Sequence, residues 1–322
     1  MAFPEKSIVI VGSGIVGLCL GVAALARGYT TIVVARDATH DTASGVAAGM
    51  IAPALEAMSD SDPETFDRLK AAQAAWLRQM PVWPKAVQDA LHRQQGAAQS
   101  RHIGADGVVS EIAGDWLVDA AATLAALRAE FSAQGGLFIT AEVAKVTAQG
   151  VTLANGDEAY GAHVVVAAGY AAKAFAADIL TLKGLTPIKG HLLDLPGQGR
   201  AGVVRSAKGY FADYGATAKF GASMEPGRDD LDIDPAVVAD LKARALLFDI
   251  PLEATTPRTG IRASTPDNWP LIGLDAASGV WIATGMRRNG YVFAPFAAEV
   301  ILDQIEGKAR PDAAVYDPQR FA

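Results

Sequence analysis

The hydrophobic pattern of the first 35 residues predicts a strand, a helix and a second strand. Residues 7–11 (SIVIV) form a continuous, mostly β-branched run, which is typical of a buried parallel strand. Residues 15–27 are apolar and helix-like, and residues 31–35 (TIVVA) form a second buried run. This order makes a βαβ unit, so we predict a parallel sheet at the N-terminus.

Similar patterns continue to residue 169. Helices are predicted at residues 63–80, 85–95 and 118–134. Strands are predicted at residues 137–146, 151–153, 158–160 and 164–168. The Asn155-Gly156 pair fits a hairpin turn. Residues 43–53 are small and apolar, and their pattern predicts no particular element.

The pattern changes between residues 188 and 223 and then returns. Short alternating runs (HLLDL, VVRS, GYFADY, AKFGAS) indicate an antiparallel sheet in this part of the chain. A helix is predicted at residues 235–247, a buried strand at 279–284 and a final helix at 294–305. We therefore predict an α/β fold in which a discontinuous, Rossmann-like domain carries an inserted antiparallel-sheet domain. The expected boundaries are residues 1–80, 114–182 and 261–322 for the first domain, and residues 81–113 and 183–260 for the second.

Composition narrows the class of protein. The chain has 322 residues, of which 51% are hydrophobic and 20% charged, and this excludes a disordered protein. A net charge of −7 makes nucleic acid or an anionic membrane an unsuitable partner. Cys19 is the only cysteine, so no intramolecular disulfide forms, and a reducing, cytoplasmic location is expected. The apolar run at residues 8–26 is interpreted as a strand and a helix, not as a membrane span, because glycines divide it.

A glycine motif follows the first strand and opens the first helix. Gly12, Gly14 and Gly17 form the pattern G-x-G-x-x-G. The first glycine permits a tight turn, the second lets a pyrophosphate approach the backbone, and the third lets the helix pack on the strand. The free N–H groups at the helix N-terminus favour phosphate. The motif therefore predicts a dinucleotide site.

The acidic residue that usually binds the ribose of the dinucleotide is missing from the end of the second strand. Ala35 stands at the expected position. Asp37 is a shifted alternative, and Arg36 is suited to a 2′-phosphate, so an NADP-dependent reductase stays open at this point.

Two loops near the C-terminus place arginines among small residues. Arg262 lies in residues 259–267 (TGIRASTPD), and Arg288 lies in residues 285–290 (GMRRNG). Loops at strand ends bind ligands in α/β proteins, and an arginine there is able to bind a carboxylate through two hydrogen bonds. A solvent-exposed arginine fits the same pattern equally well. The sequence has no G-x-S-x-G elbow, and its five histidines lack metal-ligand spacing, so neither a hydrolase nor a metal site is predicted.

Several segments carry a resemblance to a known family. They are SGVAAGMIAP at residues 44–53, WLVD at 116–119, VVVAAG at 164–169, PIKG at 187–190, TPDNWPLIG at 265–273, RNG at 288–290 and DPQRF at 317–321. In their order and spacing they resemble the glycine oxidase-like branch of the FAD-dependent D-amino-acid oxidase family, over nearly the whole chain.

The resemblance implies that the discontinuous domain binds FAD and that the antiparallel sheet of the substrate domain covers the flavin. The FAD is expected to be non-covalent, because no cysteine lies near the Arg288 loop. The residues implied in cofactor binding are Gly12, Gly14, Ile15, Val16, Gly17, Arg36, Ser44, Ala48, Gly49, Met50, Val143, Ala168, Gly169, Arg262, Arg287, Arg288, Asn289 and Gly290.

The resemblance also implies the catalytic residues. Arg262 matches the arginine that binds the substrate carboxylate, and Arg288 matches the second arginine beside it. Tyr210 is similar to the tyrosine that donates a hydrogen bond to the carboxylate. Met50 and Met224 are expected to line the pocket.

The implied reaction is oxidative deamination of a small amine or amino acid such as glycine, sarcosine or a D-amino acid. Hydride passes from the α carbon to flavin N5, and molecular oxygen reoxidises the flavin to give H2O2. A FAD-dependent dehydrogenase that passes electrons to a quinone or carrier, and a non-catalytic flavoprotein, stay open, as does a homo-oligomer. Arg287 stands where this branch usually has an aromatic residue, which suggests the hypothesis that Arg287 faces the pocket and accepts a second carboxylate.

Overall fold

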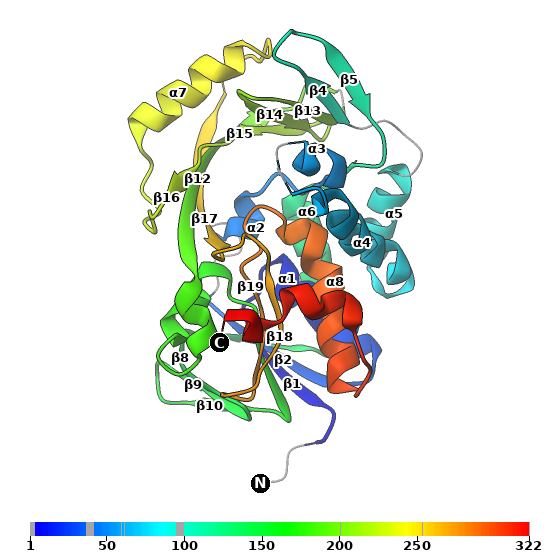
Figure 1. The fold of residues 1–322 in the computed structure, drawn as a ribbon, viewed down its shortest axis with the longest axis vertical. Helices are drawn as coiled ribbons and strands as arrows, with labels where there is room; N and C mark the ends of the chain where they lie inside the picture. The colour runs from blue at the N-terminus through cyan, green and yellow to red at the C-terminus, as the bar shows by residue number, and fades with distance from the viewer. Residues whose placement is uncertain are drawn as a thin grey trace.

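The computed structural model describes residues 4–36, 42–58, 60, 62–94, 100–199, 201–252 and 254–321. Within these residues the chain forms two large sheets, one in the lower half and one in the upper half of the molecule (Figure 1). The first is mostly parallel and the second mostly antiparallel, so the predicted α/β class with two kinds of sheet is confirmed. Asp37, the shifted candidate for ribose binding, lies outside the described residues.

The six-stranded sheet contains the N-terminal βαβ unit. Its order is β18 (Leu271–Asp275), β19 (Val280–Thr284), β11 (His163–Val166), β1 (Ser7–Val11), β2 (Thr30–Ala35) and β7 (Leu137–Thr140). β1 pairs in parallel with β2 and β11, whereas β18 is antiparallel to β19. The carboxyl ends of β1, β2 and β11 therefore meet at one edge of the sheet, where α/β proteins place their ligands.

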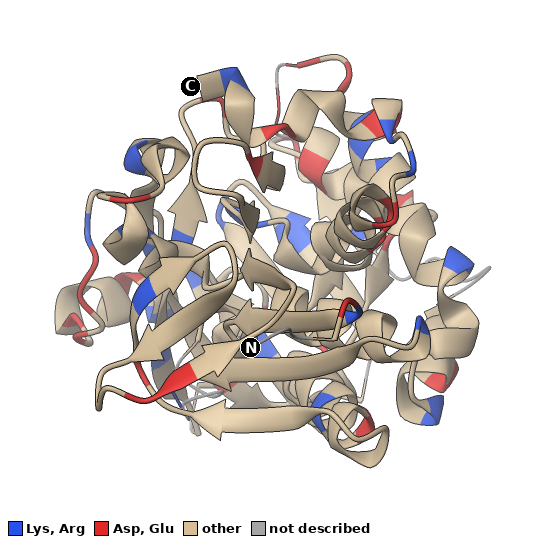
Figure 2. Ribbon diagram, turned by 90° about the horizontal axis from the view of Figure 1, so that it is seen from below, with Lys and Arg blue, Asp and Glu red and all other residues tan. Residues whose placement is uncertain are grey.

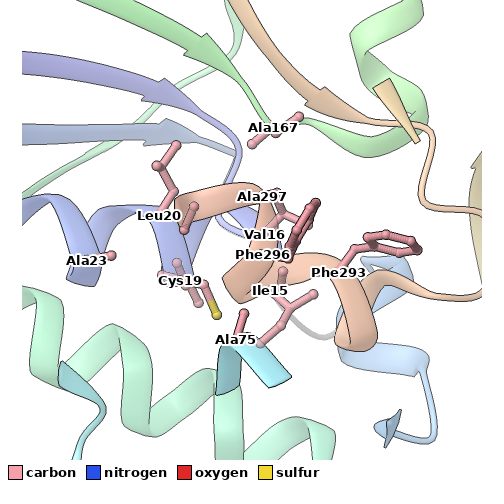
Figure 3. Close-up of a cluster of buried hydrophobic side chains, with 14 of the residues drawn as sticks. Ile15, Val16, Cys19, Leu20, Ala23, Ala75, Ala167, Phe293, Phe296 and Ala297 are labelled. Atoms are coloured by element: carbon pink, nitrogen blue, oxygen red, sulfur yellow. The ribbon is translucent and has the colours of Figure 1, made fainter. Parts of the chain in front are cut away.

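Two helices from opposite ends of the chain pack together beside this sheet. α1 (Ile15–Ala26) contacts α8 (Gly290–Ile305), and Figure 3 shows Ile15 and Val16 of α1 near Phe293 and Phe296 of α8. All of these side chains are buried. Burial also raises the pKa of the Cys19 thiol in α1, so this cysteine acts as a packing residue.

The antiparallel sheet follows the order β16 (Glu225–Pro226), β12 (Thr186–Pro196), β15 (Thr217–Gly221), β14 (Gly209–Asp213), β13 (Gly202–Ser206), β4 (Ser100–Ile103) and β5 (Val109–Ile112). β17 (Thr256–Ser264) pairs with β12 along its whole length. α7 (Pro235–Leu246) covers the outer face, because its Leu241 and Ala245 pack in one buried cluster with Leu193 and Phe220 of the sheet.

The other strands and helices lie outside the two large sheets. The remaining strands are β3 (Met50–Ile51), β6 (Trp116–Leu117), β8 (Val143–Thr147), β9 (Gly150–Leu153) and β10 (Glu158–Tyr160). The remaining helices are α2 (Ala43–Val46), α3 (Pro53–Ala57), α4 (Thr65–Arg78), α5 (Lys85–Gln94) and α6 (Ala120–Ala133), with short 3-10 turns at Met80–Val82, Gly169–Phe175, Leu180–Gly184, Pro311–Tyr316 and Pro318–Phe321.

Three predicted elements differ from the structure. The strand expected at residues 137–146 is two strands, β7 and β8, which belong to different sheets. The helix expected from residue 294 begins at Gly290, and the helix expected from residue 118 begins at Ala120 after its cap, Asp119. The Asp119 carboxylate accepts a hydrogen bond from the Ala122 N–H at 3.0 Å, which explains this start.

Figure 2 shows acidic and basic residues interspersed over the outer helices and loops. The strands of the parallel sheet carry few charged residues. Within the part of the chain that the structure describes, no helix has the length and apolar character needed to cross a membrane.

Candidate active site

The glycine turn between β1 and α1 is closely packed. Gly12 has φ +113°, and a Cβ there would lie 2.5 Å from the Ala167 carbonyl oxygen. A Cβ at Gly17 would overlap the Gly12 carbonyl oxygen. The backbone of the turn is therefore formed only by glycine at these two positions, as the motif predicts.

The N-termini of α1 and α8 lie side by side at the end of this turn. The hypothetical Cβ of Gly290, the first residue of α8, would be 3.7 Å from Ile15 Cγ2, at the first residue of α1. Neither N-cap residue, Gly14 or Asn289, makes a side-chain cap, and neither helix has an acidic side chain in its first turn. Two uncapped N-termini concentrate partial positive charge, which suits an anionic ligand.

The predicted cofactor segment at residues 44–50 is fixed against these helices. Ser44 Oγ accepts a hydrogen bond from the Ile15 N–H at 3.0 Å and lies 3.0 Å from the position that a Cβ of Gly14 would take. The Tyr291 hydroxyl donates to the Ser44 carbonyl at 3.0 Å, and the Tyr214 hydroxyl donates to the Ala48 carbonyl at 2.6 Å. The segment is thus attached to α8 on one side and to the antiparallel sheet on the other.

The other predicted cofactor residues lie around the same sheet edge. Ala168 and Gly169 follow β11, next to Gly12. Val143 begins β8, two residues after Ala141, whose N–H donates to the Ala35 carbonyl at 3.0 Å. Arg36 follows β2 and is exposed. The structure therefore places Val143 and Arg36 near the end of β2, where the adenosine half of a dinucleotide binds in this kind of fold.

Arg262 lies in β17 with its guanidinium over the backbone of β12. A Cβ at Gly190 would overlap this guanidinium, so the glycine leaves the space that the arginine occupies. Arg262 Nη1 contacts the Ser223 carbonyl oxygen at 3.4 Å and Met224 Sδ at 3.5 Å. Among the described residues no carboxylate oxygen lies within 4.0 Å of it. Burial lowers the pKa of Arg262, but a guanidinium stays charged at neutral pH.

Tyr210 lies in β14 of the same sheet as Arg262, with β15 and β12 between the two strands, and it interacts electrostatically with Arg262. It pairs with Gly221 of β15 and with Arg205 of β13, and a Cβ at Gly221 would lie 3.1 Å from its hydroxyl. Burial raises the pKa of Tyr210, and the charges of Arg262 and Arg205 oppose that shift. The hydroxyl therefore stays protonated at neutral pH and is a hydrogen-bond donor.

Arg288 is connected to this group through a buried carboxylate that the sequence did not indicate. Glu56 of α3 is only 6% exposed and forms an ion pair with Arg288. Its second oxygen accepts from Arg205 Nη1 at 2.8 Å. Asp115 fixes α3 by accepting from the Ala54 and Leu55 N–H groups at 2.9 and 3.0 Å. Glu56 therefore neutralises Arg288 and links it to the antiparallel sheet.

The two predicted pocket methionines lie on different sides of the site. Met224 is 45% exposed and lies against Arg262. Met50 in β3 packs in one apolar cluster with Tyr210 and Leu117. Met224 thus contacts Arg262, and Met50 packs in the cluster that contains Tyr210. Arg288 is connected to the antiparallel sheet through Glu56 and Arg205.

A separate cavity of about 290 Å³ lies between α5, α6 and the end of β14. Its lining includes Arg93, Asp119, Asp213 and Tyr214 but none of the predicted site residues. We therefore do not assign the reaction to this cavity.

The residues at the sheet edge fit the FAD that the resemblance implies. The glycine turn and the two helix N-termini, whose first turns carry no acidic side chain, suit a pyrophosphate, and the N-terminus of α8 suits an electron-rich ring carbonyl. An acid for the ribose is absent from position 35, which is alanine.

Comparisons with known proteins agree with this reading. The profile of the DAO family, described as FAD dependent oxidoreductase, matches residues 7–107 and 58–304. The bifunctional protein ThiO/ThiG of Nostoc sp. (strain PCC 7120) is 25% identical over 361 residues, which cover 95% of this chain and 54% of that protein. The chain thus spans about half the length of the curated relatives it matches.

Two solved structures share the fold. The crystal structure of glycine oxidase from Geobacillus kaustophilus has a TM-score of 0.81 at 21% identity, with 98% of each chain covered. Iminodiacetate oxidase from Chelativorans sp. BNC1 has a TM-score of 0.77 at 17% identity, with 97% of this chain and 98% of that chain covered. At these identities the likeness concerns the fold.

Proposed function

We propose that this chain, which belongs to the family of FAD-dependent oxidoreductases, oxidises the α carbon–nitrogen bond of a small amino acid or amine. Its cofactor is FAD, which excludes the NADP-dependent reductase considered from Arg36. The observation that carries the proposal is the partly buried Arg262 guanidinium, which forms no ion pair with a carboxylate among the described residues and interacts electrostatically with Tyr210. A buried cation with free donors is costly unless a ligand supplies the anion.

Arg262 and Tyr210 bind and orient the substrate carboxylate in this proposal. The guanidinium forms charge-assisted hydrogen bonds with the carboxylate, and the Tyr210 hydroxyl donates another. These contacts hold the α carbon in one position, and such orientation is the main contribution that a protein makes to hydride transfer. Met224 contacts the guanidinium, with its Sδ 3.5 Å from Arg262 Nη1.

We assign no side chain as a general base. Glu56 is engaged by two arginines, and Glu225 accepts from Ser223 at 2.6 Å and contacts His191 Nδ1 at 2.8 Å. The substrate amine therefore loses its proton to water and reacts in its neutral form. When bound, FAD supplies the hydride acceptor at N5.

The cofactor is held non-covalently in this proposal. Gly12–Gly17 and the N-terminus of α1 bind its pyrophosphate, Ser44–Met50 follow its central part, and Ala35, Arg36 and Val143 lie at its adenosine end. Arg288 and Asn289 in the loop before α8, and Gly290 at the start of α8, would lie at the flavin; the Asn289 N–H donates to the Met286 carbonyl at 2.8 Å, so the N-terminus of α8 would supply the positive end of a helix dipole to the flavin.

The proposal also covers the domain boundaries, the location of the protein and the electron acceptor. Residues 1–80, 114–182 and 261–322 form the FAD-binding domain, and residues 81–113 and 183–260 form the substrate domain; the boundary after residue 260 falls inside β17. The single cysteine suits a cytoplasmic location. Molecular oxygen is the proposed electron acceptor, and a quinone or carrier is the alternative.

Product analysis with an oxygen electrode tests this function. The purified holoenzyme is mixed with glycine, sarcosine and a set of D-amino acids, and oxygen uptake, H2O2 and ammonia or amine are measured. We expect equal amounts of H2O2 and imine hydrolysis product from at least one compound. Turnover only with an artificial quinone would make the chain a dehydrogenase, and no turnover with either acceptor would contradict the function.

A further inference from the structure

The candidate site holds more positive than negative charge. Four arginines, Arg205, Arg262, Arg287 and Arg288, interact with one buried carboxylate, Glu56. Glu56 forms its ion pairs with Arg205 and Arg288. Among the described residues, no carboxylate oxygen lies within 4.0 Å of Arg262 or Arg287. Arg262 and Arg287 are therefore left without an ion pair among the described residues, and the proposed substrate carboxylate pairs with only one of them.

The Arg287 backbone is fixed beside Arg262. Its N–H donates to the carbonyl oxygen of Ala263, the residue after Arg262, at 2.7 Å. Arg287 has φ +49°, a left-handed conformation that costs energy for any residue with a side chain. Such conformations are found where the surroundings hold them, often in ligand sites.

The Arg287 side chain is partly buried and lacks a partner at its inner end. Its Nε is buried and has no hydrogen-bond acceptor among the described residues. Burial lowers the pKa of the guanidinium, and the positive charges of Arg288 and Arg262 lower it further. The guanidinium is therefore partly desolvated within a group of positive charges, where an added anion is favourable.

We infer that Arg287 binds a second carboxylate of the substrate, so that the site selects amino acids or amines with two carboxylates. This inference rests on the proposed function, in which Arg262 binds the first carboxylate. FAD is a less suitable occupant of this position, because its phosphates are placed at Gly12–Gly17, whereas the charged neighbours of Arg287 are Arg262, Arg288, Glu56 and Asp60.

Two matched pairs of compounds test the inference with the holoenzyme. D-Aspartate and D-asparagine differ only in the charge of the side chain, and iminodiacetate and N-ethylglycine differ in a carboxylate on the nitrogen substituent. The first pair tests a second carboxylate on the α-carbon side chain, and the other tests one on the amine. We expect a higher kcat/KM for the dicarboxylate in one of the pairs.

Replacement of Arg287 by Met keeps a long side chain at this backbone position and removes the charge and the hydrogen-bond donors of the guanidinium. We expect Arg287→Met to lower kcat/KM for the dicarboxylate by about 10- to 100-fold, the range for one charge-assisted hydrogen bond, and to leave the uncharged compound nearly unchanged. Arg258→Met is the control, because it removes a charge in β17, the strand that also carries Arg262, at an ion pair with Asp194. The control should keep the preference.

Ligand binding gives a readout that does not depend on turnover. Calorimetry compares the Kd of malonate with that of acetate in the holoenzyme and in Arg287→Met. Tighter binding of malonate, lost in the variant, supports the inference. It is overturned if malonate and acetate bind equally to the unmodified protein, or if Arg287→Met affects both compounds of each pair equally or releases FAD. If no amine is oxidised at all, the proposed function fails, while the malonate comparison still tests the second carboxylate site.

Discussion

Arg262 depends on a glycine in the neighbouring strand for its position. Gly190 of β12 leaves the space in which the guanidinium lies, and any Cβ there would overlap it. The arginine is thus held by the shape of the sheet as well as by its contacts with Ser223 and Met224.

Gly190→Ala is therefore expected to impair substrate binding without removing a substrate contact. The added methyl group displaces the guanidinium, and loss of one charge-assisted hydrogen bond, about 1.5 kcal/mol or more, raises KM by roughly tenfold. Steady-state kinetics measure the change. Gly184→Ala is the control, because Gly184 has no positive φ and the nearest atoms to its hypothetical Cβ, in Pro266, are 3.4 Å away, an ordinary contact distance. An unchanged KM in Gly190→Ala would contradict the placement of Arg262.

The segment between β15 and α7 is held by a group of charged side chains next to the site. Lys189 of β12 pairs with Asp230, and Arg228 binds Asp230 and Glu225. His191 Nε2 accepts from the Asp234 N–H at 3.0 Å, so its other nitrogen carries the proton and donates to Glu225. This group keeps Ser223 and Met224 against Arg262.

The stability of this segment is expected to fall in acid. Hydrogen bonds from Lys189 and Arg228 hold the pKa of Asp230 well below its usual range. A carboxyl with a lower pKa in the folded chain stabilises the fold above about pH 4, and its contribution is lost as the pH falls further. Urea unfolding of the unmodified protein and of Asp230→Asn, at pH 6 and pH 3, measures this. The variant should lose less stability between the two pH values, and an equal loss would contradict the ion pairs.

The elements also show how far the sequence predicts the structure. β1, α1 and the glycine turn were predictable because their apolar runs and glycines are local signals. The break between β7 and β8 was missed, because residues 141–142 contain neither glycine nor proline and the apolar pattern runs through them. Arg262 was predictable because it lies among small residues in the segment TGIRASTPD. Glu56 was not, because it pairs with Arg205, 149 positions away along the chain, and no local pattern indicates that contact.

The predicted site takes its residues from both large sheets of the molecule. The glycine turn follows β1 of the parallel sheet, and Arg262 and Tyr210 lie in β17 and β14 of the antiparallel sheet. The return of strand and helix patterns near residue 280 predicted that the parallel sheet is completed by the C-terminal part, and β19 does pair with β11. The positions of the arginines around Glu56 were not predictable, because they depend on how α3, β13 and the loop before α8 meet.

Binding of FAD is expected to stabilise the whole fold. A ligand at 100 times its Kd adds about 2.7 kcal/mol to the free energy of unfolding, which raises Tm by several degrees. Thermal unfolding of cofactor-free protein should show this rise with FAD and none with NADP+. In Gly14→Ala the rise should be smaller, because the added methyl group lies only 3.0 Å from Ser44 Oγ and disturbs its hydrogen bond with the Ile15 N–H at the phosphate-binding turn. A rise with NADP+ alone would contradict the cofactor assignment.

The most direct test of amine oxidation is anaerobic reduction of the bound flavin. The visible absorption of the holoenzyme is recorded during addition of glycine, sarcosine, D-amino acids and dicarboxylic amines, in the unmodified protein and in Arg262→Met. We predict that the flavin band of the unmodified protein bleaches with at least one of these compounds. The variant should need roughly 10- to 100-fold more of that compound, because the carboxylate contact is lost. A flavin that bleaches with none of them, or equally well in Arg262→Met, would contradict the account.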